Sequence, residues 1–205
     1  MLSAAEALDR LRDGNRRFAA NIQPQDNRLM AQPAELTDGQ EPFAIILGCS
    51  DSRVPAEIIF DQGLGDLFVI RVAGNIVAAS QIGSVEFAAT KFGTRLVVVL
   101  GHSQCGAIEE TMQQLRAPRE NRSRNLRSIV DFVRPSVEGL LAAGLGEDPI
   151  ALAEQAVRAN VRASAEQLRH GSEILEELER KERLVIVGAE YSLETGLVDF
   201  FDGLP

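Results

Sequence analysis

Short, almost wholly apolar runs are the feature that most restricts how this chain can fold. Three of them, each ended by a turn signal, are Phe43–Leu47, Leu67–Ile70 and Leu96–Leu100. Strands that are buried on both faces of a parallel sheet have this near-continuous hydrophobicity, whereas strands with one solvated face alternate apolar and polar residues. The runs therefore predict a parallel sheet that is covered on both faces.

Helical patterns occupy the segments between the runs. One helix is expected at Ile82–Phe92, and a long helical stretch at Ala107–His170. Proline removes a backbone donor and clashes with the preceding turn. We therefore expect the long stretch to break at Pro118, at Pro135 and at 144–149.

The C-terminal part of the chain completes the sheet. A helix at Glu173–Arg183 leads into a fourth apolar run, Leu184–Ala189, and Gly196–Phe201 has the pattern of a last strand. The turn residues Glu194-Thr195-Gly196 predict that this strand is antiparallel to its predecessor. The alternation predicts an α/β fold with a mostly parallel central sheet, four parallel strands plus a C-terminal antiparallel strand, flanked by helices.

The first 39 residues differ from the rest. Ala4–Asn21 is amphipathic with helical spacing, and Ser3 is a candidate N-cap. The polar segment Asn21–Gly39 contains two prolines and predicts an extended arm that lies across another surface, such as a partner subunit. At 205 residues one domain is expected, with an N-terminal helix and arm at 1–39 and an α/β core at 40–205.

Charge and hydropathy exclude several classes of protein. The net charge of −9 argues against nucleic acid as a partner. A membrane-spanning helix would need about 18 consecutive apolar residues, and no such run is present. The charged stretch that ends at Phe18 is unlike a secretory signal. We expect no nucleic acid, no membrane and a cytoplasmic protein. The arginines clustered between Arg116 and Arg134 are interpreted as a solvated helix face or a subunit contact.

The chain has two cysteines, and each lies beside other groups that bind metals. Cys49 opens the run Cys49–Arg53, and Cys105 closes the run His102–Cys105. Each run follows a predicted strand through a glycine, Gly48 or Gly101, which we expect to let the chain turn sharply. Ligands bind at the carboxyl ends of parallel strands, so the two runs are predicted to meet there.

A Cys, His, Cys set with a nearby carboxylate is a plausible ligand set for one zinc ion. His102 and Cys105 are three residues apart at the start of a predicted helix, a spacing that places both side chains on one face. The helix N-terminus would also favour the Cys105 thiolate. A fourth position is left for Asp51 or water, and an open position is typical of catalytic zinc.

Three other interpretations fit the same residues. The two pairs can build a structural zinc site instead of a catalytic one. Cys49 and Cys105 can form a disulfide, which a reducing cytosol disfavours. His102 can act as the base for a nucleophilic cysteine, although the second cysteine then has no role.

The runs CSDSR, at Cys49–Arg53, and HSQCG, at His102–Gly106, together resemble the β-class carbonic anhydrases. The segments 66–75, 84–88 and 188–191 also resemble that family. The resemblance implies one Zn²⁺ per subunit held by Cys49, His102 and Cys105. It also implies reversible hydration of carbon dioxide to bicarbonate and a proton, and a homodimer or a tetramer of this chain.

The resemblance assigns roles to further residues. Asp51 and Arg53 match the family's Asp–Arg dyad. The implied substrate-binding positions are Gln40, a donor; Phe68, an apolar wall; Gly106, whose backbone lies close to the substrate; and Phe87, where several relatives have tyrosine.

Two thiolates cancel the charge of Zn²⁺, so the metal would be a weaker acid than in an all-histidine site, where bound water has a pKa near ~7. We therefore expect Asp51 to accept a hydrogen bond from zinc-bound hydroxide, while Arg53 keeps Asp51 ionised. Hydrolysis of COS or CS2 at the same site is an alternative. A non-catalytic zinc-stabilised scaffold is another, but it would not need the dyad.

Overall fold

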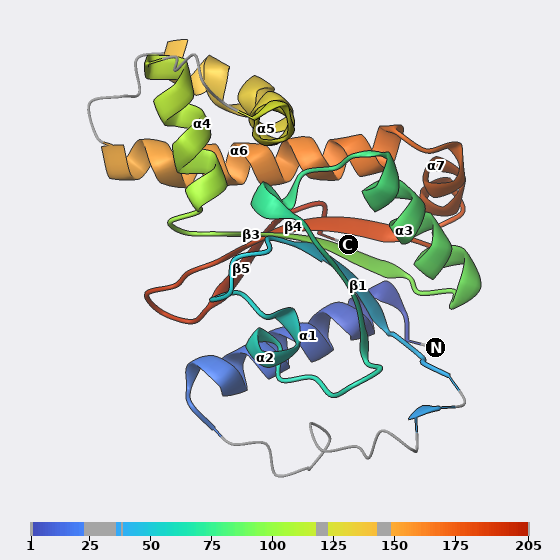
Figure 1. Cartoon of the computed structure of the whole chain (residues 1–205). Helices are drawn as coiled ribbons and strands as arrows, with labels where there is room; N and C mark the ends of the chain where they lie inside the picture. The colour runs from blue at the N-terminus through green and yellow to red at the C-terminus, as the bar shows by residue number, and fades with distance from the viewer. Residues whose placement is uncertain (1, 23–35, 38, 118–122, 143–148, 205) are drawn as a thin grey trace.

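The computed structural model describes residues 2–22, 36–37, 39–117, 123–142 and 149–204. Figure 1 shows a central sheet with the helices labelled α1 and α2 on one face and the other helices on the opposite face. The strands are β1 (Ala44–Gly48), β2 (Leu67–Arg71), β3 (Leu96–His102), β4 (Val185–Tyr191) and β5 (Val198–Asp202). The helices are α1 (Ala4–Ala19), α2 (Ala56–Ile59), the 3-10 helix η3 (Ala73–Asn75), α3 (Ala79–Lys91), α4 (Gly106–Arg116), α5 (Arg124–Ala142), α6 (Pro149–His170) and α7 (Glu173–Arg180).

The sheet has the order β2-β1-β3-β4-β5. Its first four strands are parallel, and β5 is antiparallel to β4, which confirms the predicted fold class. Every residue of β1 and of β3 is buried, as their apolar runs predicted. In the register, Gly48 at the end of β1 lies between Arg71 of β2 and Leu100 of β3. The carboxyl ends of these strands therefore form one edge.

Helix α6 packs closely on the sheet because two glycines lie beneath it. A Cβ atom on Gly101 would lie 2.5 Å from Cγ2 of Val161, and one on Gly188 would lie 2.9 Å from Cγ1 of the same valine. The expectation that Gly48 and Gly101 allow sharp turns was wrong, because both lie in strands and neither has a positive φ. Gly101 is instead explained by the close approach of α6.

The expected break at Pro135 was also wrong. Helix α5 continues through Pro135 from residue 124 to residue 142. Val130, Val133 and Val137 are buried along one side of this helix, on either side of the proline. We attribute the unbroken helix to this packing, which offsets a penalty of about 3 kcal/mol for an interior proline. Pro118 and residues 144–148 lie outside the described residues. Helix α4 ends before Pro118, and the segment 144–148 lies between the end of α5 and the start of α6.

Helix α1 begins as predicted. Ser3 accepts a hydrogen bond from the Glu6 backbone, and Glu6 accepts one from the Ser3 backbone, which forms a capping box. Leu8 and Leu11 are buried in the core beneath this chain's own sheet. Most of the predicted arm at 21–39 lies outside the described residues.

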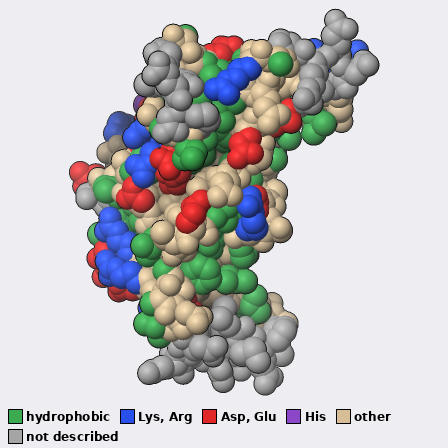
Figure 2. Space-filling model, turned by 90° about the vertical axis from the view of Figure 1, so that its left-hand side faces the viewer, with side chains coloured by type: hydrophobic (Ala, Val, Ile, Leu, Met, Phe, Trp, Pro, Cys, Tyr) green, Lys and Arg blue, Asp and Glu red, His purple; other side chains and the backbone are tan. Residues whose placement is uncertain are grey.

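Within the described part of the chain, no helix combines the length and the apolar character needed to cross a bilayer. Figure 2 shows acidic and basic side chains interspersed on one face of the molecule.

Candidate metal centre and active site

The two cysteine-containing runs meet at the carboxyl edge of the sheet. Cys49 follows β1, His102 is the last residue of β3, and Cys105 is the N-cap of α4. One potential ligand atom from each residue lies within 4.8 Å of the other two, and all three residues are buried. The neighbouring positions of β1 and β3 in the sheet bring these side chains together.

The His102 ring has one nitrogen available to a metal. His102 is fully buried, and its Nδ1 lies 2.8 Å from the carbonyl oxygen of Ser103. Nδ1 therefore carries the proton and donates it, which leaves a lone pair on Nε2. Among the described residues, Nε2 has no hydrogen-bond partner. A buried polar atom without a partner costs about 1–3 kcal/mol, and a metal ion at this position removes that cost.

The two cysteine side chains lie together and affect each other's ionisation. Both are free and buried, and the Gly74 backbone N–H donates to Cys49 Sγ at 3.4 Å. A hydrogen bond from Cys105 lowers the pKa of Cys49, and the same bond together with burial raises the pKa of Cys105. Two adjacent buried thiolates repel each other, so ionisation of both needs a cation between them. Two sulfurs and one imidazole nitrogen are a donor set that zinc prefers.

His102 and Cys105 come together by a turn and not by a shared helix face, so the reason predicted for their proximity was wrong. His102 ends a strand, and Gln104 has a positive φ of 54° in the turn that follows. The predicted position of Cys105 at a helix N-terminus holds. The backbone N–H groups of Ala107 and Ile108 lower the pKa of Cys105, although they do not outweigh Cys49 and burial.

Asp51 lies beside this cluster and is held by Arg53. The Arg53 Nε donates to Asp51 Oδ1 at 2.9 Å, and Arg53 Nη2 donates to Oδ2 at 2.8 Å. The Arg53 backbone N–H adds a third bond, to Oδ1 at 2.9 Å. The Arg53 side chain keeps the pKa of Asp51 well below its usual range, so the carboxylate is ionised. Asp51 Oδ2 lies 4.0 Å from Nε2 of His102, so the carboxylate is adjacent to the candidate ligands.

Cys49 and Asp51 both affect the pKa of His102. Burial by itself lowers the pKa of His102, but the adjacent Cys49 sulfur and the negative charge of Asp51 outweigh burial, and the pKa is raised. A neutral imidazole is the form that binds metal, so metal binding would displace a proton from this ring at acidic pH.

Two groups hold the Cys49–Arg53 loop through contacts that the sequence did not predict. Arg71 Nε donates to the Cys49 carbonyl at 3.0 Å, and Arg71 Nη2 donates to the Asp51 carbonyl at 2.6 Å. The backbone of Gly74 is the second group. A charged residue at the end of an apolar strand was the available signal for Arg71, but its target on another loop was not visible in the sequence.

The predicted substrate-binding residues lie in two places. Gly106 adjoins Cys105 at the start of α4, and a methyl group built on it would have no described residue within 4 Å apart from its chain neighbours and its own helix backbone. Gln40 precedes β1, at the opposite edge of the sheet, and lines a cavity with Phe92. The rings of Phe68 and Phe87 pack on Phe92, with centroids 6.0 and 5.8 Å from it. The structure thus does not bring Gln40, Phe68 or Phe87 to the cysteine cluster of the same chain.

The fold is α/β, with a mostly parallel sheet. At the carboxyl edge of the sheet lie three buried metal-binding side chains, Cys49, His102 and Cys105, next to an ionised aspartate. These features define the class of an α/β enzyme with a candidate metal centre. Residues 44–198 match the family model described as carbonic anhydrase. The chain therefore belongs to the carbonic anhydrase family, whose general reaction is the hydration of carbon dioxide, and it is a carbonate dehydratase.

Individual relatives agree with this assignment. A carbonic anhydrase of Mycolicibacterium smegmatis is 38% identical over 189 residues, which are 92% of this chain and 89% of the relative. Carbonic anhydrase 2 of Mycobacterium tuberculosis is 37% identical over 91% of this chain and 87% of its own length. Two solved β-carbonic anhydrases share the fold. CafA of Aspergillus fumigatus has a TM-score of 0.75 and 23% sequence identity, and CcaA has a TM-score of 0.73 and 24% identity. Each match covers 98% of this chain and 91% of the solved chain.

Proposed function

We propose that this chain interconverts carbon dioxide and bicarbonate at one zinc ion per subunit, held by Cys49, His102 and Cys105. The buried nitrogen of His102 without a hydrogen-bond partner and the pair of buried sulfurs support this assignment. Bound zinc would supply Lewis-acid activation of the water that adds to carbon dioxide.

The ionised Asp51 carboxylate beside the cluster is the observation that carries the proposal. A purely structural metal site has no use for a charged acceptor at its border, whereas an enzyme that must orient and deprotonate water does. The three hydrogen bonds from Arg53 leave about one acceptor site on Asp51, on Oδ2, because a carboxylate offers about four. Asp51 is therefore assigned the role of orienting the attacking water.

Arg53 has two roles in this mechanism. Its guanidinium keeps the Asp51 carboxylate ionised. Its bidentate grip also fixes the position of both carboxylate oxygens, with Oδ2 at 4.0 Å from Nε2 of His102. With Asp51 held by Arg53, Cys49, His102 and Cys105 would be the residues that hold zinc, and a fourth position would be left for water.

The substrate would lie beside Gly106. A Cβ on Gly106 would meet no described residue within 4 Å outside its own helix and chain neighbours, and the backbone N–H of Gly106 is the donor assigned to the oxygen on which negative charge develops. Gly106 is therefore assigned to the substrate pocket.

Gln40, Phe68 and Phe87 can reach a site of this kind only in another copy of the chain. Phe68 is the second residue of β2, three residues before the end of that strand, so it lies about 10 Å from the edge that carries Cys49. Phe87 is 51% exposed, which is unusual for a ring within an aromatic cluster. We infer that these residues line the pocket of a partner subunit. The solved structures with this fold include two tetrameric β-carbonic anhydrases of Sordaria macrospora, with a TM-score of 0.74.

Stopped-flow hydration of carbon dioxide by protein of measured zinc content tests the proposal. We expect one zinc per chain and turnover that scales with zinc content. Parallel assays with COS and CS2 separate the hydrolase alternative. A protein with a full zinc complement that consumes none of the three gases between about pH 7 and about pH 9 would instead be a zinc-stabilised scaffold.

A further inference from the structure

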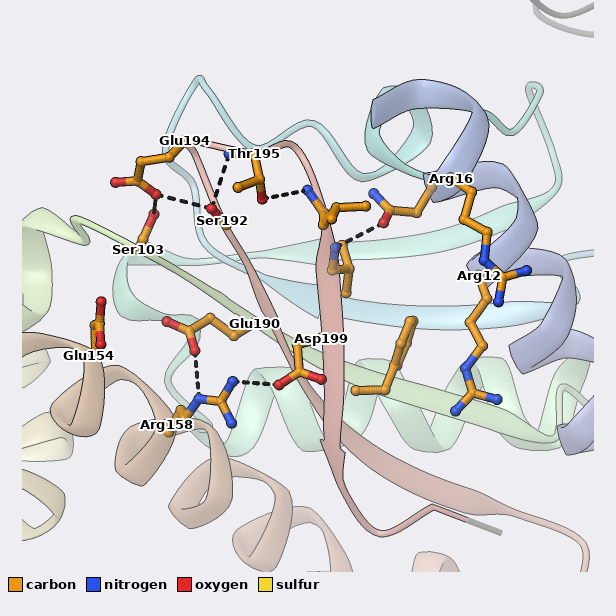
Figure 3. A pocket seen from close by; sticks show the side chains of 14 residues that line it. Arg12, Arg16, Ser103, Glu154, Arg158, Glu190, Ser192, Glu194, Thr195 and Asp199 are labelled. Carbon is orange, nitrogen blue, oxygen red and sulfur yellow. Dashed lines mark hydrogen bonds and ion pairs between the residues drawn. The ribbon is translucent and has the colours of Figure 1, made fainter. Parts of the chain in front are cut away.

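The turn between β4 and β5 is fastened to the turn that joins His102 to Cys105. Glu194 accepts hydrogen bonds from Gln104 Nε2 at 2.6 Å, from Ser103 Oγ at 3.0 Å and from Ser192 Oγ at 3.0 Å. Figure 3 shows Glu194 with Ser103 and Ser192 at one side of a cavity. Two of the three donors are thus the residues that separate the candidate ligands His102 and Cys105.

Further bonds join the same two turns. The Ser103 backbone N–H donates to the Tyr191 carbonyl at 2.9 Å, and the Leu193 backbone N–H donates to Ser103 Oγ at 2.9 Å. Gln104 has a φ of 54°, a conformation that is costly for a residue with a side chain and persists only when the surroundings hold it. The bond from Gln104 to Glu194 is the side-chain contact that holds it.

The backbone of Gln104 reaches the dyad. Its carbonyl oxygen accepts a hydrogen bond from Arg53 Nη2 at 3.2 Å, and the same Nη2 donates to Asp51 Oδ2 at 2.8 Å. A continuous series of hydrogen bonds therefore runs from Glu194 through Gln104 and Arg53 to Asp51. If Gln104 relaxes, its carbonyl moves and Arg53 loses one of its two anchors.

We propose that Glu194 is a positioning residue that keeps Arg53 on Asp51 by fixing the backbone of Gln104. This role rests on the proposed function, because it acts through the Asp51–Arg53 dyad. Glu194 is exposed at the rim of a cavity of about 630 Å³, so its side chain is not needed to fill the core.

The cavity also supplies a matched control. Glu154 carries the same charge, lines the same cavity and is exposed (Figure 3). Among the described residues it makes no side-chain hydrogen bond or ion pair to the turn at 103–104 or to Arg53. Glu154→Ala therefore repeats the change in charge and in cavity lining without touching the series of bonds.

A double-mutant cycle in the zinc-loaded protein tests the role of Glu194. We expect Glu194→Ala to lower kcat about tenfold, the scale of one lost positioning hydrogen bond, with little change in KM. Zinc content and the midpoint of thermal unfolding should match those of Glu154→Ala. In an Arg53→Ala background, Glu194→Ala should cause no further loss of kcat. An equal loss of kcat on Glu194→Ala in the wild-type and Arg53→Ala backgrounds would show that Glu194 does not act through Arg53. Loss of zinc from Glu194→Ala would show the same.

A second measurement does not depend on catalysis. The Nε–H of Arg53 is held by Asp51 and should give a slowly exchanging signal in ¹⁵N NMR spectra, assigned by its disappearance in Arg53→Lys. We expect faster exchange of this signal in Glu194→Ala, an unchanged signal in Glu154→Ala and partial recovery in Glu194→Gln, which keeps one acceptor oxygen. If the wild-type protein hydrates no carbon dioxide, the proposed function fails but this measurement still decides the positioning role. An Arg53 signal unaffected by Glu194→Ala would overturn it.

Discussion

Gly101→Ala should destabilise the protein far more than the same change at Gly48, although each glycine lies in a buried strand directly before a candidate ligand. The added Cβ at 101 would lie 2.5 Å from Val161 Cγ2 and 3.1 Å from Val157 Cγ1. At 48 it would meet only Leu100 atoms, at 3.8 and 3.9 Å, which is ordinary van der Waals contact. The two substitutions thus differ in packing and hardly in chemistry.

The size of the effect follows from the overlap. Relief of a 2.5 Å contact needs a shift of about 1 Å, and Val161 cannot supply it by rotation because a β-branched side chain in a helix has one strongly preferred rotamer. Helix α6 must move away from β3, at a cost of about 2–3 kcal/mol for an overpacked core. For a chain of this length, that loss lowers Tm by roughly 5–10 °C.

Calorimetry at one fixed protein and zinc concentration measures this difference. We expect Gly48→Ala to change Tm by less than about 2 °C, since its cost is within about 0.5 kcal/mol. Val161→Ala should partly restore Gly101→Ala, because the clashing methyl group is then absent. Equal Tm values for the two glycine variants, or no rescue by Val161→Ala, would refute the account of α6 packing.

Three further predictions concern the site. Arg53→Ala should lower kcat by about 10²-fold, the scale of lost acid–base assistance, while zinc content by atomic absorption stays near one per chain; loss of zinc would assign Arg53 to metal retention instead. Cys49→Ser should lose both zinc and hydration activity, since a hydroxyl is a poor substitute for a thiolate ligand; full activity with bound zinc would contradict the ligand assignment. Because Arg53 depresses the folded-state pKa of Asp51, this pair stabilises the fold above the unfolded pKa of about 3.9 and loses that contribution as pH falls toward the folded value. Metal-free Arg53→Ala should therefore lose less stability than metal-free wild type between about pH 4 and about pH 2 in acid titrations followed by circular dichroism; parallel titration curves would contradict this.

The sequence predicted those strands and turns that are determined by neighbouring residues. The apolar runs at β1 and β3 identified strands buried on both faces, and a turn signal before β5 predicted its antiparallel direction. The meeting of Cys49 with His102 was also predictable, because both lie at the carboxyl ends of parallel strands.

Contacts between distant segments were not predictable in the same way. Proline rules are local, so they gave no sign that buried valines would carry α5 through Pro135. The role of Gly101 depends on Val161, sixty residues later in the sequence. The role of Arg71 depends on carbonyl groups of the Cys49–Arg53 loop, about twenty residues earlier in the sequence. Gln40, Phe68 and Phe87 show a further limit, since matching positions to a family does not say which copy of the chain each residue serves.

The order of the strands has a consequence for synthesis of the protein. All three candidate ligands lie in the first 105 residues, but the carbonyl of Tyr191 that holds Ser103 and the carboxylate of Glu194 belong to the last elements of the chain. Domains are made from the N-terminus onward, at about 5–20 residues per second. A chain still on the ribosome therefore presents both thiols and the imidazole for several seconds before β4 arrives to fix the turn between them. Zinc that arrives in that interval meets a loose set of ligands, so the last strands determine when the metal becomes part of a rigid centre.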